Sequence, residues 1–272
     1  MTTTQIPALR PQTAPATGSR ARRFGSLVRG ETRMLLRNRT AVFTALVLPF
    51  LTAALFAGLG GGTGLGVALA TMLFGTGLLF VVYYTMVTSL VARREQLVLK
   101  RLQAGEPTRM EILLAPAVPL WVIITAQTAL GIALAVAVLD APVTHGWALV
   151  PALLGGTLSW TALAVWSSTW TRTVEAAQLT TLPFMLVSLV LSGLSVPLTM
   201  LPAPLERLAH VMPMTAVVDL LHLGFTGTGT GGQSLAGADA LIAAGGMVLV
   251  LVVWTALALY EGLRAFRWDA RS

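Results

Sequence analysis

Long apolar stretches, separated by short charged segments, dominate the chain from residue 40 onward. Six of them occur, at 40–59, 66–91, 112–139, 147–170, 176–196 and 240–260. None contains Lys, Arg, Asp or Glu, and each reaches the roughly 20 residues that cross a hydrocarbon core about 30 Å thick. They are continuously apolar and do not alternate as membrane β-barrel strands do. The pattern predicts an all-α, polytopic membrane protein with six transmembrane helices over 40–260.

Composition supports a membrane protein. Only 11% of the 272 residues are charged and 55% are apolar, with a mean hydropathy of +0.78, whereas soluble domains carry roughly 25% charged residues. The net charge of +7 could suggest nucleic acid as a partner. The charges are confined to the segments between the apolar stretches, so we expect no nucleic-acid binding.

The distribution of basic residues predicts the orientation. Seventeen of the 18 Lys and Arg residues fall on one side of a six-span topology, and Arg207 alone falls on the other. By the positive-inside rule both termini are then cytoplasmic. Residues 1–21 read as a disordered cytoplasmic tail and residues 261–272 as a cytoplasmic C-terminus. A single lysine among many arginines, with abundant Ala, Gly and Leu, is typical of a bacterial genome, so we expect a bacterial plasma membrane.

The segment 22–39 is amphipathic. Apolar residues such as Leu27 and Leu35 fall near one face at helical spacing, while Arg29, Arg33 and Arg37 fall on the other. Such a helix lies flat in the inner headgroup layer, with its arginines toward anionic lipid. The alternative is a basic flank that only fixes the orientation of the first span.

The loop after the second stretch predicts a short cytoplasmic helix over 93–103, ended by Gly105 and Pro107. Its charged ends and apolar middle suggest a docking surface. A solvated connector that only reverses the chain direction fits the pattern as well.

This loop resembles the coupling segment of permease subunits in the type-2 ABC exporters, which export drugs, lipids and polysaccharides. The matching residues are Arg94, Glu95, Gln96, Leu99, Lys100, Arg101, Leu102, Glu111, Ile112 and Leu113. Leu97 and Val98 stand where the family usually has Gly-Thr. The resemblance implies that Arg94, Glu95, Leu99, Lys100, Arg101 and Leu102 contact a separate ATPase subunit. It also implies a second permease, either another copy of this chain or a paralogue.

Other segments resemble the same family in the same order along the chain. They are 31–40 before the first span, 201–210 and 213–219 in the outer segment 197–239, and 264–269 at the end. The resemblance implies that 197–239 forms short helices dipping into the outer leaflet. Asp219 and His222, three residues apart there, could share a proton or contact a polar headgroup, or could form only a cap or a local hydrogen bond.

Few residues in the sequence suggest catalysis or cofactor binding. There is no cysteine, the three histidines are not spaced as a zinc site, and no phosphate-binding loop occurs. The glycine-rich segment 227–232 follows no predicted strand, so it reads as a flexible loop. We therefore expect no catalytic residue, metal or cofactor, with ATP and Mg²⁺ bound by the partner.

Two further groups of residues are candidates for function. Glu175, beside Arg172, is either a second ATPase contact or part of a surface ion pair of little worth. Tyr83, Tyr84, Gln127 and Met185 are the candidate lining of a substrate path. No predicted span carries an ionisable Lys, Arg, Asp or Glu, which disfavours an ion or proton path and suits an apolar or amphipathic substrate.

The sequence thus predicts the permease of an ATP-driven exporter for a hydrophobic drug or natural product. A lipid-linked glycan is the alternative substrate. From other classes, a membrane-embedded enzyme or a membrane-anchored immunity or sensory protein could share the topology.

Overall fold

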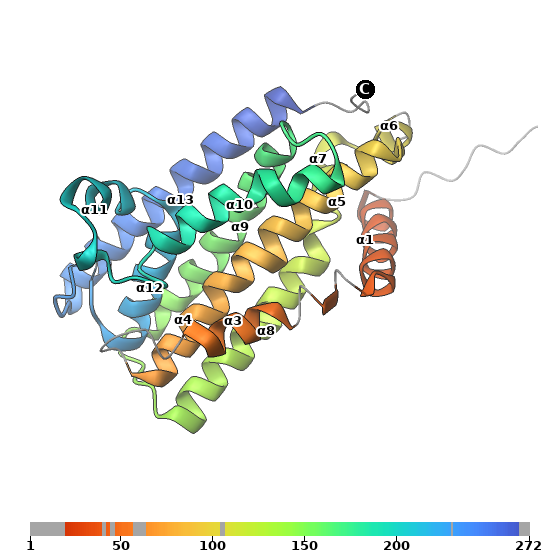
Figure 1. Ribbon diagram of the computed structural model, residues 1–272. Coiled ribbons are helices and arrows are strands. Elements are labelled where there is room, and N and C mark those ends of the chain that lie inside the picture. The colour runs from red at the N-terminus through yellow and green to blue at the C-terminus, as the bar shows by residue number, and fades with distance from the viewer. Residues whose placement is uncertain are drawn as a thin grey trace, which may run out of the picture.

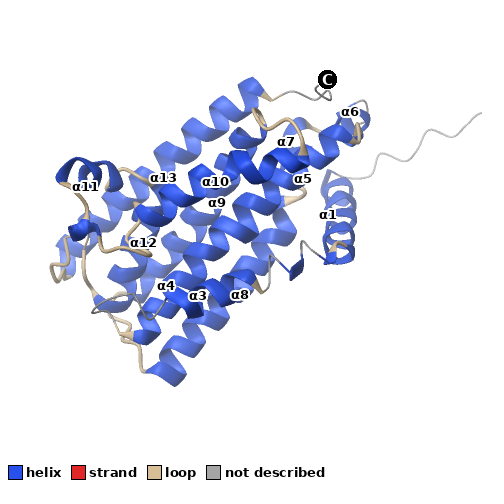
Figure 2. Cartoon of the chain, in the orientation of Figure 1, coloured by secondary structure: helices blue, strands red, loops and turns tan. Residues whose placement is uncertain are grey.

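The computed structural model describes residues 20–39, 42–43, 47–56, 64–103, 107–229 and 231–266. These residues form helices, together with one isolated antiparallel bridge between Thr228 and Ser234 (Figure 2). An all-helical structure is expected in lipid, because a helix satisfies its own backbone hydrogen bonds where no water is present.

Four helical stretches among the described residues are long and apolar enough to cross a membrane. They are Leu65–Glu95, Ala117–Leu139, Gly146–Ser168 and Gly237–Ala265. Ala203–Ala209 and Pro213–Thr226, bent by 78°, add a fifth if they count as one broken span. The prediction of a polytopic all-α membrane protein is confirmed, with four or five candidate spans.

The other two predicted spans are described less completely or are shorter. The predicted span 40–59 is represented by α3 (Leu48–Phe56), and 40–41, 44–46 and 57–59 lie outside the described residues. The predicted span 176–196 is α10 (Val174–Val190), whose 17 residues fall just below the roughly 20 that a perpendicular span needs. Of the predicted tail 1–21, residues 1–19 lie outside the described residues, and the last two belong to α1 (Arg20–Arg37).

The most buried element is a continuous helix made of α4 (Leu65–Gly77), η2 (Leu78–Tyr84) and α5 (Thr85–Glu95). In its most apolar 18-residue segment, 83% is buried. The corresponding share is 28% for the Ala117–Leu139 span and 22% for the Gly237–Ala265 span. The η2 segment is π-helical, and the Thr85 hydroxyl donates to the Phe80 carbonyl five residues back, at 2.8 Å. π-Helical turns are rare and are frequent at functional sites.

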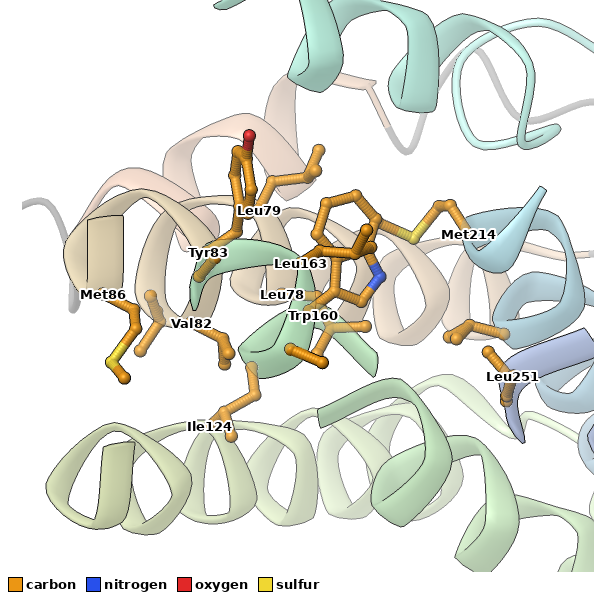
Figure 3. Packing of buried hydrophobic residues seen from close by; sticks show 14 of the residues in the cluster. Leu78, Leu79, Val82, Tyr83, Met86, Ile124, Trp160, Leu163, Met214 and Leu251 are labelled. Atoms are coloured by element: carbon orange, nitrogen blue, oxygen red, sulfur yellow. The ribbon is translucent and has the colours of Figure 1, made fainter. Parts of the chain in front are cut away.

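Three further long helices build the bundle: the first two pack on the central helix, and the third packs on the second, away from the central helix (Figure 1). They are α8 (Ala117–Leu139), α9 (Leu149–Ser168, preceded by η3, Gly146–Ala148) and α13 (Gly237–Ala265). Leu78, Tyr83, Ile124 and Trp160 meet in the core that these helices enclose (Figure 3).

The two ends of the bundle differ (Figure 1). At one end lie α6 (Val98–Gln103), α7 (Arg109–Leu114) and, beside them, α1. At the other end lie α11 (Ala203–Ala209) and α12 (Pro213–Thr226), preceded by η4 (Leu198–Met200). The bend between α11 and α12 is fixed to α13, because the Trp254 indole donates to the Val211 carbonyl at 2.7 Å.

The contact between α9 and α13 depends on a small residue. A Cβ atom at Gly262 would lie 3.2 Å from the backbone nitrogen of Trp166, which cannot rotate away. We predict that Gly262→Leu destabilises the protein by about 1–3 kcal/mol through overpacking, measured as a lower Tm in detergent. Gly245→Leu on the same helix is the control, because nothing lies within 4 Å of its Cβ position. Equal Tm values for the two variants would contradict the packing assigned to Gly262.

Candidate functional site

Two consecutive arginines end the central helix, and both are buried. Arg93 is 5% exposed and Arg94 is 1% exposed. A buried guanidinium is costly unless hydrogen bonds or an opposite charge compensate for its lost hydration. Because the two residues are adjacent on a helix, they point in different directions and have different partners.

Arg94 contacts the end of α9. Its Nη1 atom donates to the Ser168 carbonyl at 2.8 Å and its Nη2 atom donates to the Thr171 carbonyl. Carbonyls at a helix C-terminus have no partner within the helix and carry the negative end of its dipole, so a cation is favourable there. Arg94 therefore joins α5 to the turn between α9 and α10, and its side chain is not part of the exposed surface.

Arg93 pairs with α1 through an ion pair with Glu31, which is 9% exposed. Glu31 lies four residues after Leu27 and four before Leu35, so it shares the inward face of α1 with them. Arg29, Arg33 and Arg37 are exposed. The prediction from sequence gave these arginines and the apolar face but missed Glu31, although its spacing from Leu27 and Leu35 was a visible signal.

The short helix α6 is fixed to the bundle by Leu99, which is fully buried, and by Leu102, which packs against the core. The Leu99 side chain thus points into the core and anchors α6 there, rather than facing outward. The exposed residues here include Glu95, Leu97 and Arg101. The side chain of Lys100 lies outside the described residues.

Leu97 occupies the turn between α5 and α6 in a left-handed conformation, with φ of 57°. This conformation costs a non-glycine residue roughly 1–2 kcal/mol, which explains why glycine is usual at this position in the similar segment. The side chain is nevertheless a leucine, 41% exposed. An exposed apolar side chain in a strained backbone is a candidate contact residue.

The remaining part of the loop that resembles the coupling segment, residues 108–113, has a structural role. Thr108 and Glu111 cap α7 reciprocally: the Glu111 amide donates to the Thr108 hydroxyl at 3.3 Å, and the Thr108 amide donates to the Glu111 carboxylate at 2.7 Å. Ile112 and Leu113 are 1% and 2% exposed. This arrangement fixes the direction in which the chain re-enters the bundle as α8.

Glu175 is exposed in the first turn of α10, where Thr173 caps the helix by accepting from the Ala176 amide at 3.1 Å. Arg172, which the sequence suggested as its partner in a surface ion pair, is also exposed. In the described part of the chain no ion pair joins Arg172 to Glu175.

The four predicted path residues differ in burial. Tyr83 is buried, with its hydroxyl 2.9 Å from that of Ser167 and its ring against Trp160. Gln127 is 5% exposed, while Tyr84 and Met185 are half-buried. None of the four lines the two cavities at the α11–α12 end that are described next.

Asp219 and His222 line a cavity of about 340 Å³ at the end of the bundle where α11 and α12 lie. Its walls come from α4, from residues 192–199, from α12 and from the glycine-rich segment. Asp219 also lines a second cavity, of about 220 Å³, together with His210 and Gln233. Within the described residues no cluster of His, Cys, Asp and Glu could hold a metal ion.

The family described as ABC-2 type transporter matches residues 22–226, which include α1, the central helix, α6 and α12. No curated protein matches the chain. The family match covers well over half of the chain and contains both buried arginines.

We predict that Arg94→Met destabilises the protein, because two carbonyls lose a charged donor and each such hydrogen bond contributes about 1.5–3 kcal/mol. Thermal denaturation in detergent measures the effect as a lower Tm. Arg101→Met is the matched control, since Arg101 is exposed one turn beyond the α5–α6 turn. Similar Tm values for both variants would contradict the role of Arg94.

Proposed function

The chain belongs to the ABC-2 type transporter family, and on this basis we propose that it is the permease subunit of an ATP-driven exporter. The ABC-2 domain is the non-catalytic transmembrane component of such a transporter. It binds no cofactor and works with ABC ATPase subunits, which bind the ATP. We propose that this chain crosses a bacterial plasma membrane six times, with both termini in the cytoplasm, and pairs with a second copy or a paralogue.

The observation that carries the proposal is the construction of the α5–α6 turn. Leu99 anchors α6 to the core, while Glu95, Leu97 and Arg101 are exposed around it. We propose these three, with Lys100, as the contact with the ATPase subunit. Glu175, exposed at the start of α10, is proposed as a second contact.

The buried arginines give a route by which movement of α6 reaches the spans. A displacement of α6 moves the end of α5, where Arg94 holds the α9–α10 turn and Arg93 holds α1. ATP binding can favour one packing of the spans only through contacts that differ between the two packings. Arg94 is therefore proposed to transmit the movement from within the bundle, and Leu99 and Leu102 to keep α6 attached while it moves.

A hydrophobic or amphipathic drug or natural product is the proposed substrate, with a lipid-linked glycan as the alternative. The apolar stretches without charged residues favour the first. Because Tyr83 and Gln127 are buried within a single chain, we propose that the path lies between two permeases. The half-buried Tyr84 and Met185 are then better candidates for its lining than Tyr83 and Gln127. Membership of a transporter family disfavours an immunity protein, a sensor or an enzyme.

We predict that Leu97→Asp and Arg101→Glu uncouple the transporter. Each changes an exposed side chain of the proposed contact, so the Tm of the permease stays within about 2 °C, as expected for surface substitutions. Transport and substrate-stimulated ATP hydrolysis by the reconstituted complex fall by about 10-fold, which corresponds to roughly 1.4 kcal/mol of lost coupling.

Arg207→Glu is the matched control, because it reverses an exposed charge on α11 at the opposite end of the bundle. It leaves transport and hydrolysis unchanged. Normal stimulation of hydrolysis in both Leu97→Asp and Arg101→Glu would refute the contact.

A further inference from the structure

The outer cavity of about 340 Å³ lies among four segments that are distant in sequence. Thr71 comes from α4, Ser195 from the turn before η4, and Asp219 and His222 from α12. Glycines of the segment 229–232 complete the wall, Gly232 in a left-handed conformation with φ of 75°. The cavity is thus assembled by the fold.

Thr71 differs from most buried threonines of this chain. Thr76, Thr128, Thr161, Thr171 and Thr181 each donate their hydroxyl to the carbonyl four residues back, at 2.6–3.0 Å. Thr71 is 4% exposed, lines the cavity, and its Oγ1 atom has no hydrogen-bond partner among the described residues. A buried polar atom without a partner costs roughly 1–3 kcal/mol, and a bound ligand would remove that cost.

Ser195 repeats the observation on the facing wall. Its Oγ atom is buried and, over the described ranges, also lacks a hydrogen-bond partner. Two hydroxyls from separate segments therefore line the same cavity without partners. Such groups require an explanation, of which an absent ligand is one.

The charges of the cavity restrict the ligand. Asp219, 8% exposed, provides a carboxylate, and His222 is the one basic side chain among the described lining residues. The carboxylate would repel an anionic ligand. A protonated amine is favoured, because its N–H groups can donate to the carboxylate and to the hydroxyls of Thr71 and Ser195.

The size and position of the cavity indicate the rest of the ligand. A volume of about 340 Å³ is at the lower end of the roughly 300–1,000 Å³ of small-molecule sites, so it suits a headgroup better than a whole drug. Its apolar lining includes Met72, Leu194 and Val218, and α10 nearby exposes apolar residues such as Leu186 and Val187. An apolar tail could therefore extend from the cavity along the outside of the bundle.

We propose that this cavity binds the primary ammonium group of an amphiphile, held by Asp219, Thr71 and Ser195. The amine belongs either to a lipid headgroup of the outer leaflet or to an exported amphiphilic molecule. The site is inferred from its lining residues and does not require the proposed ATPase contact. It depends on the proposed exporter function only for the side of the membrane on which it lies.

The direct test uses three probes with the same alkyl chain: octylamine, octanol and octanoate. The purified protein in a neutral maltoside detergent is heated with each probe. Octylamine raises the Tm progressively with concentration, as mass action requires of a ligand that binds the folded state, whereas octanol and octanoate do not. An equal effect of octanol or octanoate would overturn the proposal.

Two variants locate the effect. Asp219→Asn weakens the apparent affinity for octylamine at least 10-fold. Thr71→Val removes the unpartnered hydroxyl, so it raises the Tm without ligand and reduces the response to octylamine. Thr88→Val is the control, because that hydroxyl already donates to the Tyr84 carbonyl at 3.0 Å near the other end of the central helix, and it keeps the full response. If Asp219→Asn does not fold, the response of the Tm of Thr71→Val to octylamine tests the site by itself. An unchanged octylamine response in the variants that fold would refute the site.

Nanodiscs distinguish the two sources of the amine. A lipid ligand makes the wild-type Tm higher in phosphatidylethanolamine than in phosphatidylcholine, and Asp219→Asn removes the difference. An exported ligand leaves the Tm equal in the two lipids while octylamine still raises it. If the Tm is the same in the two lipids and octylamine also fails to raise it, the proposal is overturned. That outcome would leave the proposed ATPase contact at Leu97 and Arg101 unaffected.

Discussion

Two guanidinium groups at the end of the central helix must be compensated inside the protein, because burial removes the water that would otherwise solvate them. Arg94 is compensated by carbonyls of Ser168 and Thr171, and Arg93 by the carboxylate of Glu31. Each solution fixes a different neighbour: the α9–α10 turn in one case and α1 in the other. Removing one partner of a buried pair leaves an uncompensated charge, which is much worse than losing a surface contact. The positions of α1, α5, α9 and α10 at this end are therefore mutually dependent.

That dependence links a surface to the interior. α6 directly follows the helix that carries the two arginines, and Leu99 holds it against the core. A force on the exposed Leu97 or Arg101 is thus applied close to the points where the spans are joined. Packed interiors switch between discrete arrangements rather than deforming continuously. A small displacement of α6 is on this account sufficient to favour a second arrangement of the spans.

Much of this architecture follows from the sequence, since an apolar stretch without charges in lipid has little alternative to a helix. The central helix, α8, α9 and α13 lie where the apolar stretches at 66–91, 112–139, 147–170 and 240–260 predicted them. The distinction between an exposed residue and a buried anchor could not be predicted. Arg94 and Arg101 are both cationic members of one motif, yet one is buried and the other exposed. Leu99 and Leu97 show the same contrast among apolar residues. Which side of a short helix faces the bundle depends on tertiary packing, and one turn of helix carries too little periodicity to reveal it.

The end of the bundle formed by α11 and α12 shows the same physical constraint in a different form. Asp219 and His222 were visible as polar residues in an apolar segment, but Thr71 was not, because threonine in a span usually bonds to its own helix. Only the three-dimensional arrangement brings its unpartnered hydroxyl to the cavity that Ser195 and Asp219 also line. The buried charges at the α6 end thus have partners within the fold, whereas the Thr71 and Ser195 hydroxyls at the α12 end have none among the described residues.

The claim that α6 receives the force of an ATPase subunit can be tested most directly by labelling. The chain contains no cysteine, so Arg101→Cys and Arg207→Cys each provide a single reactive site for a membrane-impermeant maleimide. We expect Cys at position 101 to react only in inside-out vesicles and to be protected when the ATPase subunit is bound, and Cys at position 207 to react only in right-side-out vesicles. Labelling of position 101 from the outside, or equal labelling with and without the ATPase subunit, would contradict this account.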